Sequence, residues 1–183
     1  MMLCMISGGI DLSVVATANF SGILSCMFLV KMIPEGSSTA YAAAMLILAV
    51  ALSLLVGLAC GALNATLIAK VGIPPILATL GGGDLIMGAA LALTKGSSIS
   101  NIPPILSGVG THTIFGILPV TLVTFVLCAL MVARLLNKKT YGYKLYMMGS
   151  NPIASTYSGT DNDQVIYQTF MTSGLLASVS GLL

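Results

Sequence analysis

Long apolar stretches separated by short polar segments dominate the chain. A helix needs about 20 apolar residues to cross the core of a bilayer. Five stretches reach or approach this length, at residues 12–30, 40–69, 76–94, 114–133 and 165–183. The first extends back towards residue 1 through a glycine pair, Gly8 and Gly9, at which a helix can break. The pattern predicts an all-α protein, a polytopic transmembrane helix bundle of about five spanning segments, one of them broken at this glycine pair.

The composition supports an integral membrane protein. Charged residues make up only 7% of the chain and hydrophobic residues 57%, whereas soluble domains carry about 25% charged residues. The net charge of +2 is small, and no cluster of Lys and Arg with interleaved aromatic residues suggests nucleic-acid binding. The four cysteines lie in apolar segments without CxxC spacing, and His112 is the only histidine. We therefore expect neither a metal site nor a His-based catalytic triad.

Basic residues are distributed unequally between the two ends of the expected spans. If the helices alternate in direction, Lys70, Arg134, Lys138, Lys139 and Lys144 fall on one side, and Lys31 and Lys95 on the other. Because cytoplasmic segments carry an excess of Lys and Arg, the first side is predicted to be cytoplasmic. This topology places residues 137–164 in the cytoplasm, as the longest connection on that face, and residues 95–113 outside.

A carboxylate follows the glycine pair in the stretch SGGIDLS, residues 7–13. If a helix restarts there, Asp11 lies near its N-terminus, where backbone N–H groups and the helix dipole favour an anion. Ser13 could add a capping hydrogen bond. Two interpretations stay open: Asp11 caps a helix near the membrane interface, or it lines a path for a polar solute. The two roles are compatible.

A second glycine–acid stretch, GGGDL at residues 81–85, resembles GGIDL at residues 8–12. Many transporters carry paired broken helices in their two halves, but five residues do not establish a duplication. The second stretch places Asp84 inside an apolar span. Asp84 could begin a second helix, pair with a cation elsewhere, or have no role, and the sequence does not decide between these.

Small and polar residues mark one face of the span at residues 40–69. Gly57, Gly61 and Ala65 form a stripe of small residues at helical spacing, which favours close packing of another helix. Asn64 lies near the cytoplasmic end of the same span. Its amide is expected to hydrogen-bond a neighbouring helix.

A short helix is predicted within the cytoplasmic segment. Asn151 can act as its N-cap, with Pro152 at the first helical position. Residues 153–157 would follow, and Gly159 would end the helix. Such a helix could be a docking element for a partner or an ordinary connector.

Three stretches together resemble a known family. SGGIDLS, GALNATLIAKVGIPPILATLGG and YMMGSNPIASTYSG occur in this order, from residue 7 onwards. They look like the permease subunits of bacterial ABC importers for ribose, galactose and related simple sugars. The chain departs from the family pattern at Asp84, Met87, Ser155, Thr156 and Thr160, which bears on coupling strength and activity.

The resemblance implies an assembly in the bacterial inner membrane rather than an enzyme. Two permease subunits, as a homodimer or heterodimer within the lipid, form the pore, a cytoplasmic ATP-binding subunit drives it, and a periplasmic or lipid-anchored sugar-binding protein delivers the solute. No cofactor is expected in the permease itself, because the partner binds and hydrolyses ATP. Family members are longer, so residues 1–183 look like one permease domain that is incomplete at both ends.

The resemblance also assigns roles to individual residues. The segment that contacts the ATPase lies within residues 137–164 and comprises Gly149, Ser150, Asn151, Pro152, Ala154, Ser155, Ser158 and Gly159. The residues placed near the solute pathway are Gly8, Gly9, Asp11, Ser13, Asn64 and Thr79. Two alternatives remain: a secondary transporter or channel that uses Asp11 and Asp84 as a relay, and a truncated subunit that does not transport.

Overall fold

The computed structural model describes residues 1–33, 38–97, 99, 113–114 and 118–183. His112 and most of the predicted outer segment at residues 95–113 lie outside the described residues. The helices are α1 (Met2–Ile6), α2 (Val14–Met32), α3 (Thr39–Ala69), α4 (Pro75–Thr94), α6 (Val120–Lys138), α7 (Thr140–Ser150), α8 (Pro152–Tyr157) and α9 (Asn162–Gly181). Two-residue strands, β1 (Thr113–Ile114) and β2 (Leu118–Pro119), pair antiparallel. The predicted all-α class is confirmed.

Among the described residues, four helices are long and apolar enough to cross a membrane: α2, α3, α4 and α6. Three of them fall within two residues of the predicted boundaries. The fourth differs, because Thr113–Ile114 and Leu118–Pro119 form the paired strands and α6 begins only at Val120. Pro119 precedes α6 with φ −66° and ψ 140°, and it has no N–H to donate to a preceding turn. The span predicted at residues 114–133 was therefore placed too early, and α6 includes Arg134 and Lys138.

The fifth predicted span forms α9, which is as long as α4 but more polar. It is not among the helices that qualify as spans by composition. Its inward residues are mostly small or hydroxylated, including Thr169, Ser173, Gly174 and Ser178, and these are buried. They face α3 and α2, the helices that α9 contacts most. Because α9 is enclosed by other helices, it does not need an apolar surface all round.

Glycines bring α3 and α9 into backbone contact. A Cβ at Gly174 would overlap the carbonyl of Gly57, and a Cβ at Gly57 would overlap the carbonyl of Gly174. One turn further along α3, a Cβ at Gly61 would overlap the carbonyl of Phe170. Ala65, the next residue of the stripe, is fully buried. The predicted close packing along this stripe is confirmed, and its partner is α9.

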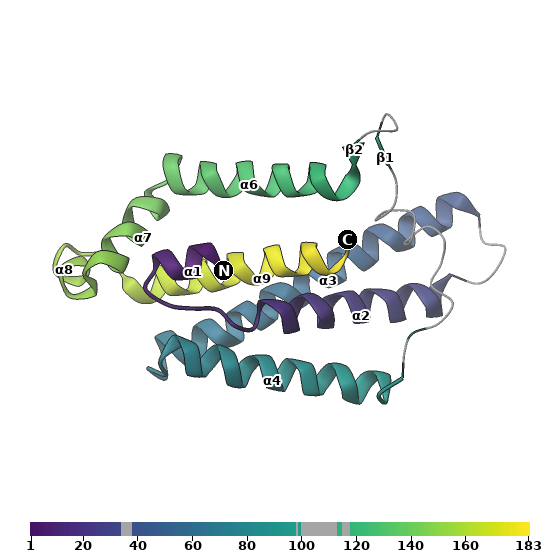
Figure 1. Cartoon of the computed structure of the whole chain (residues 1–183), viewed down its shortest axis with the longest axis horizontal. Helices are drawn as coiled ribbons and strands as arrows, with labels where there is room; N and C mark the ends of the chain where they lie inside the picture. Colours follow the sequence, from purple (N-terminus) through teal and green to yellow (C-terminus); the bar gives the residue numbers. More distant parts are fainter. Residues whose placement is uncertain (34–37, 98, 100–112, 115–117) are drawn as a thin grey trace.

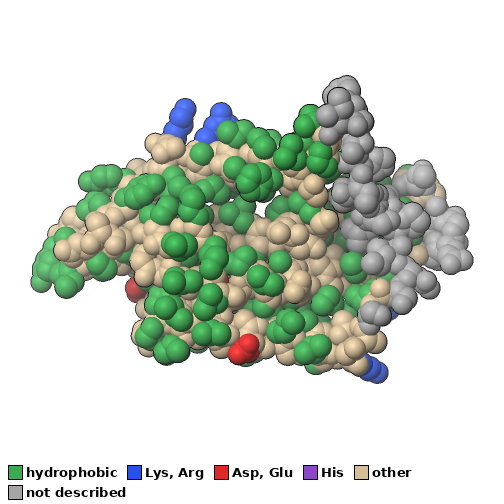
Figure 2. Space-filling model, viewed as in Figure 1, with side chains coloured by type: hydrophobic (Ala, Val, Ile, Leu, Met, Phe, Trp, Pro, Cys, Tyr) green, Lys and Arg blue, Asp and Glu red, His purple; other side chains and the backbone are tan. Residues whose placement is uncertain are grey.

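The helices run side by side with α4 along one edge and α6 along the opposite edge (Figure 1). The predicted cytoplasmic segment is mostly helical: α7 and α8 lie together at one end of the bundle. Basic side chains project near the α7 end of α6, while hydrophobic side chains cover much of the remaining visible face (Figure 2). This distribution is typical of a helix bundle surrounded by lipid.

Replacing Gly174 by alanine tests the backbone contact between α3 and α9. The added methyl group would force the two helices apart, and overpacking of this kind typically lowers the free energy of unfolding by about 1–3 kcal/mol. Gly88→Ala in α4 is the matched control, because nothing lies within 4 Å of a Cβ there. Thermal unfolding in mild detergent should show a lower midpoint for Gly174→Ala alone. Equal midpoints would contradict the described packing.

Candidate functional site

The glycine pair ends α1 and turns the chain. Gly8 has φ +84°, its N–H donates to the carbonyl of Met5 at 3.1 Å, and the N–H of Gly9 donates to the carbonyl of Cys4 at 2.9 Å. These two bonds form a Schellman motif, in which glycine supplies the left-handed residue. Gly9 has a different role, because a Cβ there would lie 2.9 Å from the Cβ of Pro75. The predicted break is confirmed, and it packs against the start of α4.

Between α1 and α2 the chain is not helical, and its backbone is satisfied by a side chain of α4. The N–H of Leu12 donates to Thr79 Oγ1 at 3.1 Å. The same oxygen lies 3.1 Å from the carbonyl of Ile10 and 2.8 Å from the carbonyl of Pro75. Thr79, fully buried, therefore links this non-helical segment to α4. Without such a partner, buried backbone groups would be strongly destabilising in an apolar bundle.

The helix α2 begins inside the bundle rather than at its end. Its N-cap, Ser13, has its Cα 3.5 Å from the position of a Cβ on Gly83, which is about halfway along α4. The first N–H groups of a helix have no partner within the helix, and together they carry a partial positive charge. A negative group nearby is therefore favourable.

Asp11 supplies that negative group and is 3% exposed. Its Oδ1 accepts hydrogen bonds from the N–H of Ser13 at 3.0 Å and from the Ser13 hydroxyl at 2.7 Å. Its Oδ2 accepts one from the hydroxyl of Ser173 in α9 at 2.7 Å, and Cys4 Sγ lies at 4.0 Å. The carboxylate thus joins the α1–α2 break to α9. The expectation that the Ser13 side chain caps α2 was wrong, because its hydroxyl donates to Asp11 instead.

Asn64 extends the cluster to α3. Its Nδ2 donates to Ser13 Oγ at 2.7 Å, so the predicted hydrogen bond to a neighbouring helix is confirmed. Asn64 is 1% exposed, and its Oδ1 has no hydrogen-bond partner among the described residues. That oxygen lies against Gly82, where a Cβ would overlap it. Gly82 is therefore needed to accommodate the amide.

Sequence reasoning missed two members of this cluster, Ser173 and Gly82. A signal for Ser173 existed, because Thr169, Ser173 and Ala177 follow each other at four-residue intervals in α9 and are all buried. Spacing of this kind places them on one face of a helix. Four of the residues predicted near a solute pathway, Asp11, Ser13, Asn64 and Thr79, are brought together with the glycine break.

Asp84 does not belong to this cluster. It lies within the continuous helix α4 on its exposed side, while Gly82 and Gly83 face the cluster. The suggestion that it begins a second helix was wrong, and the structure does not bring Asp11 and Asp84 together as a relay. In the part of the chain that the structure describes, no three His, Cys, Asp or Glu side chains are grouped as metal ligands.

The short helix predicted after Asn151 is confirmed as α8. The side chain of Asn151 accepts a hydrogen bond from the N–H of Ala154 at 3.0 Å, and Pro152 is the first helical residue. Gly159, with φ +81°, follows the last turn, and the N–H of Thr160 donates to the carbonyl of Ser155 at 3.1 Å. Both ends of α8 are therefore capped by local interactions.

Asn162, the first residue of α9, holds α8 in place. The hydroxyl of Ser155, which is fully buried, donates to Asn162 Oδ1 at 2.9 Å. Asn162 Nδ2 donates to the carbonyl of Pro152 at 2.9 Å and lies 3.0 Å from Thr156 Oγ1. Every hydrogen-bonding atom of this amide is thus used on α8.

The opposite side of α8 is open to solvent. Ile153 is 70% exposed and Tyr157 is 89% exposed. The adjoining helix α7 is fixed to α1 by Gly149, where a Cβ would overlap the carbonyl of Ile6. The remaining predicted contact residues have local bonds: Ser150 Oγ donates to the carbonyl of Met147, and Ser158 Oγ to the carbonyl of Ser155. A rigid, partly apolar helix therefore projects from this end of the bundle.

Comparison with known proteins identifies the family. The family described as branched-chain amino acid transport system / permease component matches residues 1–183. The chain belongs to this permease family. It is 29% identical over 186 residues to the autoinducer 2 import system permease protein LsrD of Enterobacter sp. (strain 638), which covers 98% of this chain and 53% of that protein. It is 30% identical over 186 residues to LsrD of Klebsiella pneumoniae, covering 98% and 52%. No solved structure matches.

Membership of this permease family confirms the resemblance predicted from the three motifs. With four apolar helices in the part that the structure describes, the chain is a multi-pass protein of the bacterial inner membrane. The family is one of transport proteins rather than of enzymes in general. The chain spans about half the length of the curated relatives it matches.

Replacing Asp11 by alanine tests whether the buried cluster holds the helix break together. The change leaves the buried N–H and hydroxyl donors of Ser13 and the hydroxyl of Ser173 without their acceptor. Each such loss typically costs about 1–3 kcal/mol, so unfolding in detergent should show a loss of roughly 3 kcal/mol or more. Asp84→Ala, on the exposed side of α4, is the control, and its effect should stay within about 0.5 kcal/mol. Similar losses for both variants would rule out the structural role of Asp11.

Proposed function

We propose that the protein is a permease subunit of an ATP-driven importer for a sugar or a sugar-like solute. The family membership and the relatives named for autoinducer 2 import support an importer of this kind. The observation that carries the proposal is α8, a capped and exposed helix that Asn162 holds to α9, the helix enclosed by the bundle. A separate cytoplasmic ATPase would bind its exposed face, and ATP would be bound and hydrolysed there.

The proposed solute path runs beside the non-helical segment between α1 and α2. Transporters use broken helices because their free helix ends and unpaired backbone groups can meet a polar solute within the membrane. Here Asp11, Ser13, Asn64 and Thr79 are engaged with one another and with the backbone of the segment. We assign them the role of holding the segment in place, so that the path keeps its shape while solute passes.

The remaining partners follow from the same proposal. A second permease subunit would complete the pore, and a periplasmic or lipid-anchored binding protein would deliver the solute. Selectivity would then reside chiefly in the binding protein. The permease needs hydrogen-bonding groups along the path but no tight site.

The double variant Ile153→Ser/Tyr157→Ser tests the ATPase contact. Both side chains are exposed and make no contribution to the core, so the fold should be retained. If Tyr157 is an interface hot spot, its truncation costs about 2 kcal/mol or more, so recovery of the ATPase subunit in a pull-down should fall about tenfold or more. The control is Val71→Ser, which removes an exposed apolar side chain from the turn between α3 and α4, at the same predicted face.

A second variant, Asn162→Ala, distinguishes binding of the ATPase to α8 from the effect of α8 on solute uptake. It keeps the exposed face of α8 but removes the bonds that fix α8 to α9. We expect the ATPase to be retained while solute uptake by the assembled importer falls. Unchanged recovery of the ATPase with the double variant would overturn α8 as the docking element, and recovery of no ATPase at all by the unaltered protein would overturn the importer itself.

A further inference from the structure

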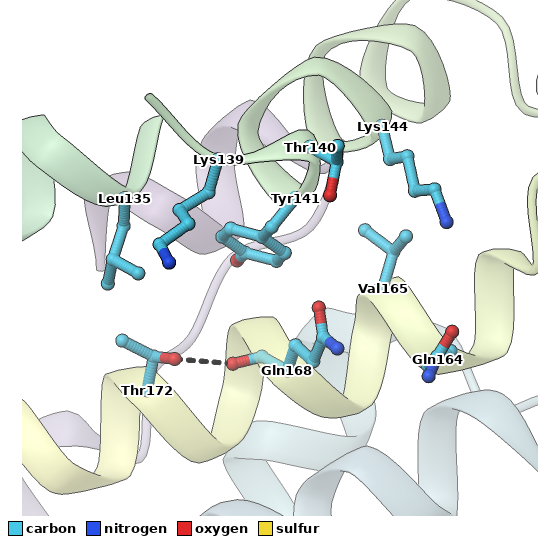
Figure 3. A pocket seen from close by; sticks show the side chains of 9 residues that line it. All are labelled: Leu135, Lys139, Thr140, Tyr141, Lys144, Gln164, Val165, Gln168 and Thr172. Carbon is cyan, nitrogen blue, oxygen red and sulfur yellow. Dashed lines mark hydrogen bonds between the residues drawn. The ribbon is translucent and has the colours of Figure 1, made fainter. Parts of the chain in front are cut away.

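A cleft of about 480 Å³ lies where α6, α7 and α9 meet. It is bounded by Leu135 of α6, by Lys139 and the first turns of α7, and by Gln164, Gln168 and their neighbours in α9. Figure 3 shows Tyr141 and Gln168 extending towards one another between α7 and α9, with Lys139 and Lys144 on either side of Tyr141. This cleft is separate from the buried cluster around Asp11 and from the exposed face of α8.

The charge in this cleft is positive. Lys139 and Lys144 line it, together with the amides of Gln164 and Gln168, and none of the described lining residues is acidic. Burial raises the pKa of the Tyr141 hydroxyl, which lies 2.8 Å from Thr169 Oγ1, so this group stays neutral. Two ammonium groups beside neutral hydrogen-bonding groups suit a phosphate, to which lysine binds as a point charge.

An apolar groove continues from the cleft along α6. A second hollow of about 300 Å³ is lined by Leu127, Leu130, Met131 and Arg134, and it shares Leu135 and Lys139 with the first. The apolar residues lie towards the middle of α6, and the basic ones lie at its end. Among the described residues α6 packs chiefly on α7, and no residue of α6 is buried.

We propose that the two hollows together hold one anionic phospholipid of the cytoplasmic leaflet. Its anionic head group lies in the cleft that Lys139 and Lys144 line, and its acyl chains follow the apolar groove of α6. The ligand must be both anionic and amphipathic, because cationic and apolar surfaces meet at Lys139. Basic hollows between membrane helices on the cytoplasmic side are typical sites for anionic head groups. An apolar protein segment would not complement the positive charge of Lys139 and Lys144.

The site does not rest on the proposed transport function. It concerns retention of a lipid, which can be measured on the purified protein without its partners. The two lysines that line the cleft also differ from ordinary interfacial lysines, whose side chains extend into the lipid head groups. Lys138 is such a residue: it ends α6 beside Lys139 but does not line the cleft.

The test is native mass spectrometry of the protein, purified from its own membranes in mild detergent and titrated with phosphatidylglycerol or phosphatidylcholine. We expect one phosphatidylglycerol to be retained at concentrations where phosphatidylcholine is not. Lys139→Gln/Lys144→Gln should weaken this retention about tenfold, because each lysine near an anionic lipid adds to the attraction. Lys70→Gln/Lys138→Gln removes the same charge from the same predicted face and should retain the lipid.

Two further variants keep the result interpretable. Lys139→Arg/Lys144→Arg preserves the charge and should restore retention, and circular dichroism of each variant checks the fold. Leu135→Trp places a larger side chain where the two hollows meet. It should displace the lipid although both lysines are present. Equal weakening in the two glutamine pairs would overturn the site in favour of non-specific attraction. Absence of any bound lipid would also overturn it.

Discussion

The hydrogen bonds of the Asp11 carboxylate make it possible for this bundle to contain a broken helix. Ending α1 and starting α2 within an apolar bundle exposes backbone groups that lipid cannot satisfy. The carboxylate meets this requirement at the start of α2 and uses its second oxygen to bind α9 through Ser173. Thr79 does the same for the backbone preceding α2, from the side of α4. The break is therefore an ordered structure, joined to three other helices.

The central position of α9 follows from the same requirement. A helix that must donate to a buried carboxylate and approach α3 backbone to backbone needs hydroxyl groups and glycine on its inner face, and Ser173 and Gly174 provide them side by side. Such residues lower the hydropathy of the helix. The least apolar of the long helices is thus the one most enclosed by protein, whereas α6, which is strongly apolar, has the least protein around it.

The sequence predicted features that depend on short-range rules. The break at Gly8 and Gly9, the cap at Asn151 and the end of α8 at Gly159 each require only a few neighbouring residues with restricted backbone conformations. The partner of Asn64 could be anticipated as another helix but not as Ser13. The bond between Ser173 and Asp11 joins residues 162 positions apart, and no local pattern specifies it.

The boundaries of helices, and the faces of helices that individual residues occupy, were predicted less well. Hydropathy alone predicted that the fourth span begins at residue 114. In the structure α6 begins at Val120, because the paired strands and Pro119 precede it. Asp84 follows glycines just as Asp11 does, yet α4 continues through it, because Gly82 and Gly83 serve the packing of Asn64 and Ser13 rather than a turn. Similar short motifs thus adopt different structures because their surroundings differ.

The amide of Asn162 makes α8 and α9 one mechanical body. A short turn at residues 158–161 connects α8 to α9, and from Asn162 about 16 Å of continuous helix leads to Ser173. The same helix thus contacts α8 through Asn162 at its start and the Asp11 carboxylate through Ser173 further along. One helix, α9, therefore joins the exposed helix α8 to the buried cluster around Asp11.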